Sequence, residues 1–212
     1  MGNLLTANVT PTEIQIHVGT TSTITSTFAV PGSAPAGLSM GSSGNLVSGD
    51  NGTDKIYVHS GISATISSSF TSADSLIQGL SLSSGGNLIS TGRGTDKIFV
   101  HDGITSTITA SWAGGANSTG LAVDSLGNLI STFLNTPKIR IHSGITSTIT
   151  SSFSYAYSAP RDLTLDGSGN LLVADSSDVK VYIFVGISAT LSSSFPATGT
   201  PTGMTMDSEG GC

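Results

Sequence analysis

The hydrophobic and polar residues of the chain alternate with the two-residue period of β-strands, and this pattern recurs along its whole length. The tripeptide Gly-Asn-Leu begins at residues 2, 44, 86, 127 and 169, so its copies are 42, 42, 41 and 42 residues apart. A fixed period of this length indicates a repeat architecture. No window sustains the i, i+3, i+4, i+7 spacing of an amphipathic helix. The sequence therefore predicts an all-β repeat protein.

One copy of the repeat, residues 79–112, contains four short segments with strand character. We predict strands over residues 80–82, 87–90, 97–101 and 105–112. The turn between the first two strands is rich in Gly and Ser, which tolerate the backbone angles that a tight hairpin needs. Four-stranded antiparallel units that repeat in series are the blades of a β-propeller.

The two ends of the sequence predict the number of blades. The chain begins in a second-strand segment, residues 2–7, and ends in a first-strand segment, residues 203–207. These segments complete one blade between them, so we expect a five-bladed propeller of four-stranded antiparallel blades, closed by pairing of the N- and C-terminal strands. The same two segments could pair between molecules and generate a chain of subunits. The single domain, residues 1–212, is divided into repeats of about 2–36, 37–78, 79–119, 120–161 and 162–202, with 203–212 completing the first blade.

The fifth repeat resembles an NHL-type propeller repeat through residues 162–175, DLTLDGSGNLLVAD, and 180–184, KVYIF. The likeness covers the first three strands of every unit, whereas the fourth strand, rich in Ser and Thr, departs from the charged outer strand expected of that family. The resemblance implies a propeller fold. It leaves function open, because NHL-like propellers include binding modules, scaffolds and a few lyases.

Composition and charge exclude several classes of partner. Only 9% of the residues are charged and the net charge is −6, which argues against binding to nucleic acid or to an anionic membrane. A single cysteine, Cys212, excludes an internal disulfide. The chain shows no signal peptide, and we expect an extracellular or cell-surface location from its low charge and its 37 serines and 28 threonines.

The loops that differ most between repeats are the candidates for a binding site. They connect the second strand to the third, and the fourth strand to the next unit, and in a propeller both sets lie on one rim. Aromatic rings beside amides, carboxylates and arginine suit a neutral, hydroxyl-rich ligand. We therefore expect a carbohydrate or a protein surface as the partner, with the alternative that these loop tips are simply polar. The predicted ligand-binding residues are Asp50, Asn51, Arg93, Phe133, Asn135, Tyr155, Tyr157, Arg161 and Asp175.

The residues that recur in every unit are expected to be structural. His17, His59, His101 and His142 occupy one equivalent position, where Phe184 stands in the fifth unit. Equivalent positions in different blades lie too far apart to share a metal, so we predict packed histidines and neither a metal nor a cofactor. Three recurring aspartates are predicted to hold turns, and three N-x-[ST] sequons mark glycosylation candidates. These residues are Asp124, Asp166 and Asp207, and Asn8, Asn51 and Asn117 respectively.

Three functions are compatible with these observations. The first is a non-catalytic binding module, similar in architecture to five-bladed lectins of the tachylectin type, with a carbohydrate bound on the rim. The second is a self-assembling structural or scaffold subunit. The third is an NHL-like lyase, although the sequence contains no G-x-S-x-G elbow, H-E-x-x-H motif or P-loop. We predict that the protein is not an enzyme.

Overall fold

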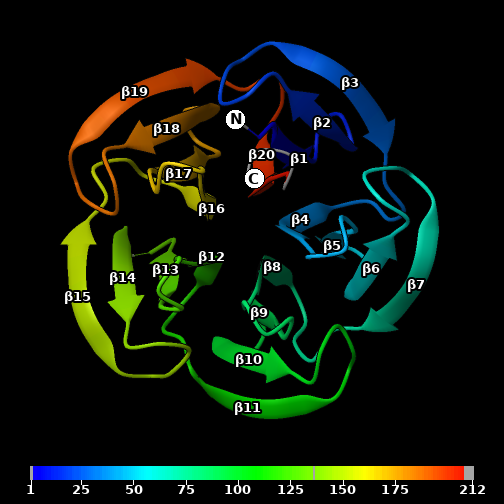
Figure 1. The fold of residues 1–212 in the computed structure, drawn as a ribbon, viewed down its shortest axis with the longest axis horizontal. Helices are drawn as coiled ribbons and strands as arrows, with labels where there is room; N and C mark the ends of the chain where they lie inside the picture. The colour runs from blue at the N-terminus through cyan, green and yellow to red at the C-terminus, as the bar shows by residue number, and fades with distance from the viewer. Residues whose placement is uncertain (1, 136, 208–212) are drawn as a thin grey trace.

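The computed structural model describes residues 2–135 and 137–207. Within these residues, twenty strands form five four-stranded antiparallel sheets arranged as blades around a central axis (Figure 1). The first blade contains β20 (Pro201–Met206), β1 (Leu4–Asn8), β2 (Glu13–His17) and β3 (Ile24–Ala29). The second contains β4 (Pro35–Met40), β5 (Leu46–Asp50), β6 (Lys55–His59) and β7 (Ile66–Thr71), and the third β8 (Ile77–Leu82), β9 (Leu88–Gly92), β10 (Lys97–His101) and β11 (Ile108–Ala113). The fourth contains β12 (Ser118–Val123), β13 (Leu129–Phe133), β14 (Lys138–His142) and β15 (Ile149–Ser154), and the fifth β16 (Pro160–Leu165), β17 (Leu171–Asp175), β18 (Lys180–Phe184) and β19 (Leu191–Pro196).

The predicted five-bladed, all-β propeller is confirmed, and so is its closure within one chain. β20 pairs antiparallel with β1 inside the first blade, with Leu4 opposite Met206 and Thr6 opposite Met204. The backbone N–H of Asp207 also donates to the carbonyl of Asn3 at 2.8 Å. The terminal strands are therefore part of one sheet. Within the described residues, no helix has the length and apolar character needed to cross a membrane.

Three of the four strands predicted in residues 79–112 have boundaries that differ by one to three residues, and β9 spans Leu88–Gly92 where 87–90 was predicted. The innermost strand β8 begins at Ile77, three residues before the predicted start, because Gly79 continues the pairing with β9. The outermost strand β11 begins at Ile108, because the preceding residues form the turn out of β10. In that turn the Thr105 hydroxyl donates to the carbonyl of Asp102 at 2.7 Å and accepts the N–H of Thr107 at 3.2 Å.

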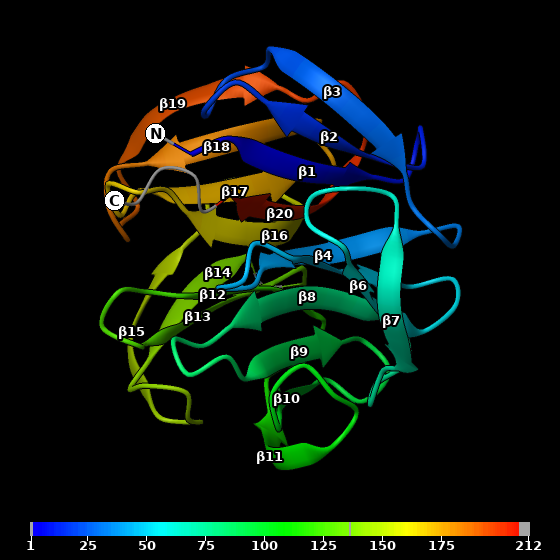
Figure 2. The same cartoon turned by 45° about the vertical axis from the view of Figure 1, so that its right-hand side comes forward.

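The hydrophobic core is divided into five clusters, each between two neighbouring blades. In one cluster, Val47 and Ile56 of the second blade pack against Ile77, Leu80 and Leu88 of the third. The oblique view in Figure 2 shows the sheets following one another around the axis, with β4 beside β8 and β16 beside β20. Each blade therefore depends on its two neighbours for burial of its apolar faces.

Truncation of Leu88 to Ala should lower the free energy of unfolding by about 2 to 5 kcal/mol, because the side chain is fully buried between blades. Leu126 is the matched control, since it is 85% exposed in a turn and its truncation should change stability by less than about 0.5 kcal/mol. Chemical denaturation of both variants measures the difference. Equal effects would contradict the burial of β9 between blades.

Candidate functional site

The recurring turns at one face of the ring are held by the asparagine of each Gly-Asn-Leu tripeptide. Asn45 Oδ1, for example, accepts the N–H of Gly61, which lies in the turn between the third and fourth strands, at 2.9 Å. The Asp124 carboxylate accepts the N–H groups of Leu126 and Asn128 at 2.9 and 2.7 Å. These bonds confirm the structural role predicted for the turn residues. The same asparagine bond recurs at Asn3–Gly19, Asn87–Gly103, Asn128–Gly144 and Asn170–Gly186, and the same aspartate role at Asp166 and Asp207.

The four equivalent histidines are buried, and each bonds within its own blade. His101 Nε2 lies 2.8 Å from the hydroxyl of Ser90 on the neighbouring strand, and its Nδ1 lies 2.7 Å from the carbonyl of Thr105. The other histidines make the same Nε2 contact, at 2.8 to 3.0 Å. They are packed side chains, as predicted. Among the described residues, no three His, Cys, Asp or Glu side chains lie close enough together to hold a metal ion.

The fifth blade replaces both members of this pair at once. Where the other blades have a hydroxyl and an imidazole, it has Val173 and Phe184, which are both buried in the apolar cluster between the fourth and fifth blades. A buried polar group left without its partner costs free energy, whereas replacing both partners by apolar groups can be nearly neutral. The joint replacement explains how phenylalanine is tolerated at a histidine position.

The variants Ser90→Val and His101→Phe should each lower the free energy of unfolding by about 1 to 3 kcal/mol, and the double variant should cost clearly less than their sum. Burial lowers the pKa of His101 below its ordinary 6.5, so the unfolded state takes up the proton first and stability falls as the pH drops below about 6.5. The double variant should lose less stability on acidification. A denaturation cycle at several pH values measures both effects, and additive costs would contradict the pairing.

The innermost strands approach one another most closely at one level of the central channel. A Cβ at Gly37 would lie 2.5 Å from the backbone nitrogen of Leu80, and one at Gly79 would lie 2.6 Å from the carbonyl of Thr119. Only glycine fits such an approach without moving the backbone. The equivalent positions in the remaining blades are Gly120, Asp162 and Gly203.

Asp162 is the exception among these five positions, and its side chain is completely buried. Its Oδ2 accepts the N–H of Met204 at 2.8 Å and that of Leu38 at 3.5 Å, so one carboxylate bonds to the inner strands of two other blades. Two cavities lie along the channel. The first is lined by inner-strand residues that come just before the five crowded positions, and the second by those that come just after them, such as Leu38 and Met204. Asp162 therefore lies between the two cavities, inside the ring.

Burial raises the pKa of Asp162 well above its ordinary value of 3.8, although nearby backbone N–H groups act in the opposite direction. Because the folded-state pKa is the higher one, the contribution of this group to stability is complete below pH 3.8 and is lost as the pH rises through the raised pKa. Asp162→Asn should abolish that loss, because the amide does not ionise. Unfolding free energies of both proteins across acidic to neutral pH test this, and parallel profiles would contradict it.

Several predicted rim residues lie inside the rim instead of on its surface. The carboxylate of Asp50 accepts the backbone N–H groups of Ala34 and Thr53 at 2.9 and 2.8 Å. Asp175 is likewise fully buried, and its carboxylate accepts three backbone N–H groups at 2.9 to 3.1 Å. Both carboxylates thus connect two loops of the same blade. In the third blade Asp74 connects the two loops instead, because its carboxylate accepts the N–H and the hydroxyl of Thr95.

The predicted aromatic residues also pack inward. Phe133 is 1% exposed and lies under the guanidinium of Arg140, whose Cζ is 4.1 Å from the ring centroid. Tyr155 is buried, and Tyr157 stacks on Tyr182 with ring centroids 3.7 Å apart. Burial raises the pKa of Tyr155 above its ordinary value, so this phenol stays neutral. These rings fill the space beside the fourth and fifth blades instead of forming an open platform.

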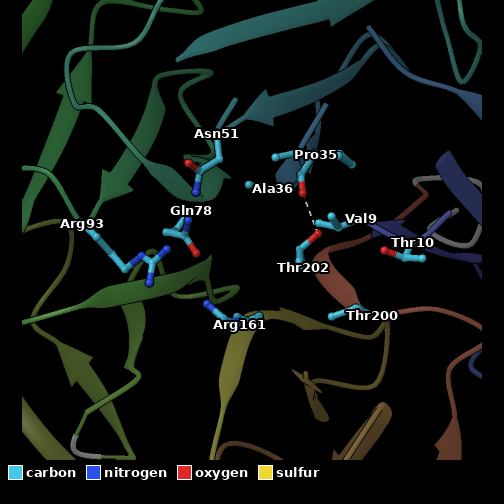
Figure 3. Close-up of a pocket in the computed structure, with 11 residues that line it drawn as sticks. Val9, Thr10, Pro35, Ala36, Asn51, Gln78, Arg93, Arg161, Thr200 and Thr202 are labelled. Atoms are coloured by element: carbon cyan, nitrogen blue, oxygen red, sulfur yellow. Dashed lines mark hydrogen bonds between the residues drawn. The ribbon is translucent and has the colours of Figure 1, made fainter. Parts of the chain in front are cut away.

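Three of the predicted residues do converge on one place. Asn51, Arg93 and Arg161 line a cavity of about 250 Å³ at the end of the channel where the inner strands begin (Figure 3). Gln78 of β8 joins them on the same side, whereas Asn135 is exposed and does not line the cavity. The remaining lining residues are Val9, Thr10, Ala34, Pro35, Ala36, Thr200 and Thr202.

The two arginines give this cavity a local positive charge in an acidic protein. In Figure 3 the guanidinium group of Arg93 and the nitrogen end of Arg161 lie near each other, and Gln78 lies above them in this view. Arg161 Nε donates to the hydroxyl of Ser176 at 2.8 Å, whereas Arg93 Nε is buried without a hydrogen-bond partner among the described residues. Burial, and then the charge of Arg93, lower the pKa of Arg161 below its ordinary value. An arginine pair with free donors is suited to a carboxylate, sulfate or phosphate group.

The sequence contains a signal for this cavity that loop variability alone does not give. The residue just before each close approach of the inner strands differs between most blades, although the residue that follows it is glycine in four of the five. Four of these five residues line the cavity, whereas Thr119 is fully buried and donates to the carbonyl of Pro160 at 2.9 Å. The five residues are Ala36, Gln78, Thr119, Arg161 and Thr202.

The predicted glycosylation asparagines have different surroundings. Asn8 is fully buried at the end of β1. Asn51 is partly exposed and lines the cavity. Asn117 is partly exposed and adopts a positive φ of 55°, with its N–H donating to Asp96 at 2.8 Å.

The described residues form a five-bladed β-propeller with a cavity of polar and apolar lining at one mouth of its channel. No known sequence family and no curated protein matches the chain. Solved structures do resemble it. A chain of the nidogen/laminin complex is 17% identical, with 98% of each chain covered and a TM-score of 0.73. Glutaminyl cyclase of Myxococcus xanthus is 14% identical, with 77% of this chain and 70% of that one covered and a TM-score of 0.66.

A third similar structure is a protein of unknown function from Bacteroides caccae. It is 13% identical to this chain, with 92% of this chain and 73% of that one covered and a TM-score of 0.60. These likenesses identify the fold as a β-propeller. At such identities they carry no residue of an active or binding site across, and membership of the NHL family stays a prediction.

Proposed function

We propose that the protein is a non-catalytic binding module of extracellular type, with a carbohydrate held in the cavity at the mouth of the channel. The observation that carries this proposal is the convergence of Asn51, Gln78, Arg93 and Arg161 from three blades on one cavity. Amide and guanidinium groups bind hydroxyl and carboxylate oxygens, and at neutral pH they do not exchange protons as a general acid or base must.

The opposite wall of the cavity suits the apolar face of a sugar ring. Val9, Pro35 and Ala36 provide apolar surface there, and Thr10 and Thr200 add hydroxyl groups at its edge. Small-molecule sites combine such apolar surface with a few polar groups that fix orientation. The buried aromatic rings of the rim have no part in this arrangement.

Substitution of Asn51 by Ala should weaken glycan binding, because it removes an amide from the cavity wall. Loss of one neutral hydrogen bond corresponds to about a threefold to tenfold weaker affinity. Asn135→Ala is the matched control, since Asn135 is an exposed amide that does not line the cavity. A glycan array followed by titration of the best ligand gives the measurement. The absence of any bound glycan, or equal weakening by both substitutions, would refute the proposal.

Self-assembly into a scaffold is the second candidate, and the outer strands favour it. β3, β7, β11, β15 and β19 carry no charged residue, and most of their residues are exposed. Soluble sheets commonly protect such edges with charged side chains or proline. Pairing of outer strands between molecules would use these edges without opening the ring. Sedimentation velocity over a wide concentration range tests this candidate, and a constant monomer would eliminate it.

A further inference from the structure

We infer that Arg93 and Arg161 form an anion-binding pair and that the ligand of the channel mouth is a sugar acid, with its carboxylate on the two guanidinium groups. This inference rests on the proposed function and specifies its ligand. Its basis is the placement of two cations from the third and fifth blades in one cavity.

Like charges are not brought together in a folded protein without a compensating interaction. Arg93 and Arg161 lie near each other in Figure 3, and their mutual repulsion contributes to the lowered pKa of Arg161. The third arginine shows what a structural guanidinium looks like in this protein. Arg140 stacks on Phe133 and donates from Nη1 to the carbonyl of Gly114 at 3.1 Å.

Two carboxylates close to Arg161 accept hydrogen bonds from backbone N–H groups. Asp175 influences Arg161 electrostatically, but its two oxygens accept the N–H groups of Ala159, Ser177 and Asp178. Asp162 follows Arg161 in the chain. Its Oδ2 is bonded to the backbone of two other blades, whereas its Oδ1 is buried without a hydrogen-bond partner among the described residues. Arg93 Nε is buried and has no hydrogen-bond partner in the described part of the chain. An anion in the cavity would supply acceptors for the guanidinium groups that line it.

The other lining groups favour a sugar acid over a simple inorganic anion. Asn51 and Gln78 place neutral amides beside the arginines, where hydroxyl groups of a ring would lie. Val9 and Pro35 face them across the cavity. Its volume of about 250 Å³ is larger than a sulfate or phosphate ion needs. A sugar acid matches this lining, because its carboxylate suits the arginines, its hydroxyls suit the amides and the apolar face of its ring suits Val9 and Pro35.

Isothermal titration with glucuronate, glucose and sodium sulfate tests the inference. Glucuronate should bind, more weakly as ionic strength rises, and glucose and sulfate should each bind at least about tenfold more weakly. Arg93→Gln and Arg161→Gln should each weaken glucuronate binding by about tenfold or more. Lys97→Gln, which removes one positive charge from an exposed side chain outside the cavity, should leave binding unchanged.

The outcomes separate this inference from the proposed function. Binding of glucose as tight as that of glucuronate, and independent of the arginines, would support the carbohydrate module and overturn the anion pair. Binding of sulfate as tight as that of glucuronate would overturn the sugar acid and the carbohydrate module together. No binding of any probe would overturn the anion pair, whereas the carbohydrate module is refuted only if the glycan array also shows no bound glycan. Arg93→Gln should keep the wild-type melting temperature, since Arg93 Nε has no hydrogen bond to lose within residues 2–135 and 137–207, so a fall in its binding reports on the cavity.

Discussion

The close approach of the five innermost strands to the axis is the constraint on which the rest of the structure depends. With a Cβ at Gly37 or Gly79, the neighbouring inner strand would have to move, and with it the interblade cluster behind it. The single exception, Asp162, bonds through one oxygen to the inner strands of two other blades. The ring, its closure by β1 and β20, and the position of the cavity all follow from this packing.

Much of the fold was predictable because the same strand pattern recurs in all five repeats of the sequence. The two-residue alternation gave the strands, the Gly-Asn-Leu spacing gave the blades, and the partial units at the two ends gave the closure. The boundaries of β8 and β11 were less predictable, because pairing through Gly79 and the hydroxyl bonds of Thr105 depend on geometry that a pattern of apolar residues does not carry.

The candidate site was only partly predictable, because variation between repeats has two origins. Asp50 and Phe133 differ from their counterparts in most other blades because each packs against a neighbouring glycine. A Cβ on Gly32 would collide with Asp50, and a Cβ on Gly115 would collide with Phe133. Arg93 and Arg161 differ as well, but they meet in a cavity although they are far apart in the sequence. Only the closed ring distinguishes the two cases, since it shows which side chains already have partners.

The most direct test of the proposed anion binding in the cavity uses the three arginines of the chain as probes. Nitrogen NMR of the Nε–H groups should give three signals, and Arg140 is an internal control because its guanidinium is already occupied. On addition of glucuronate we predict shifts of the Arg93 and Arg161 signals and a constant Arg140 signal. Saturating glucuronate that leaves the signals of Arg93 and Arg161 unchanged would contradict the account.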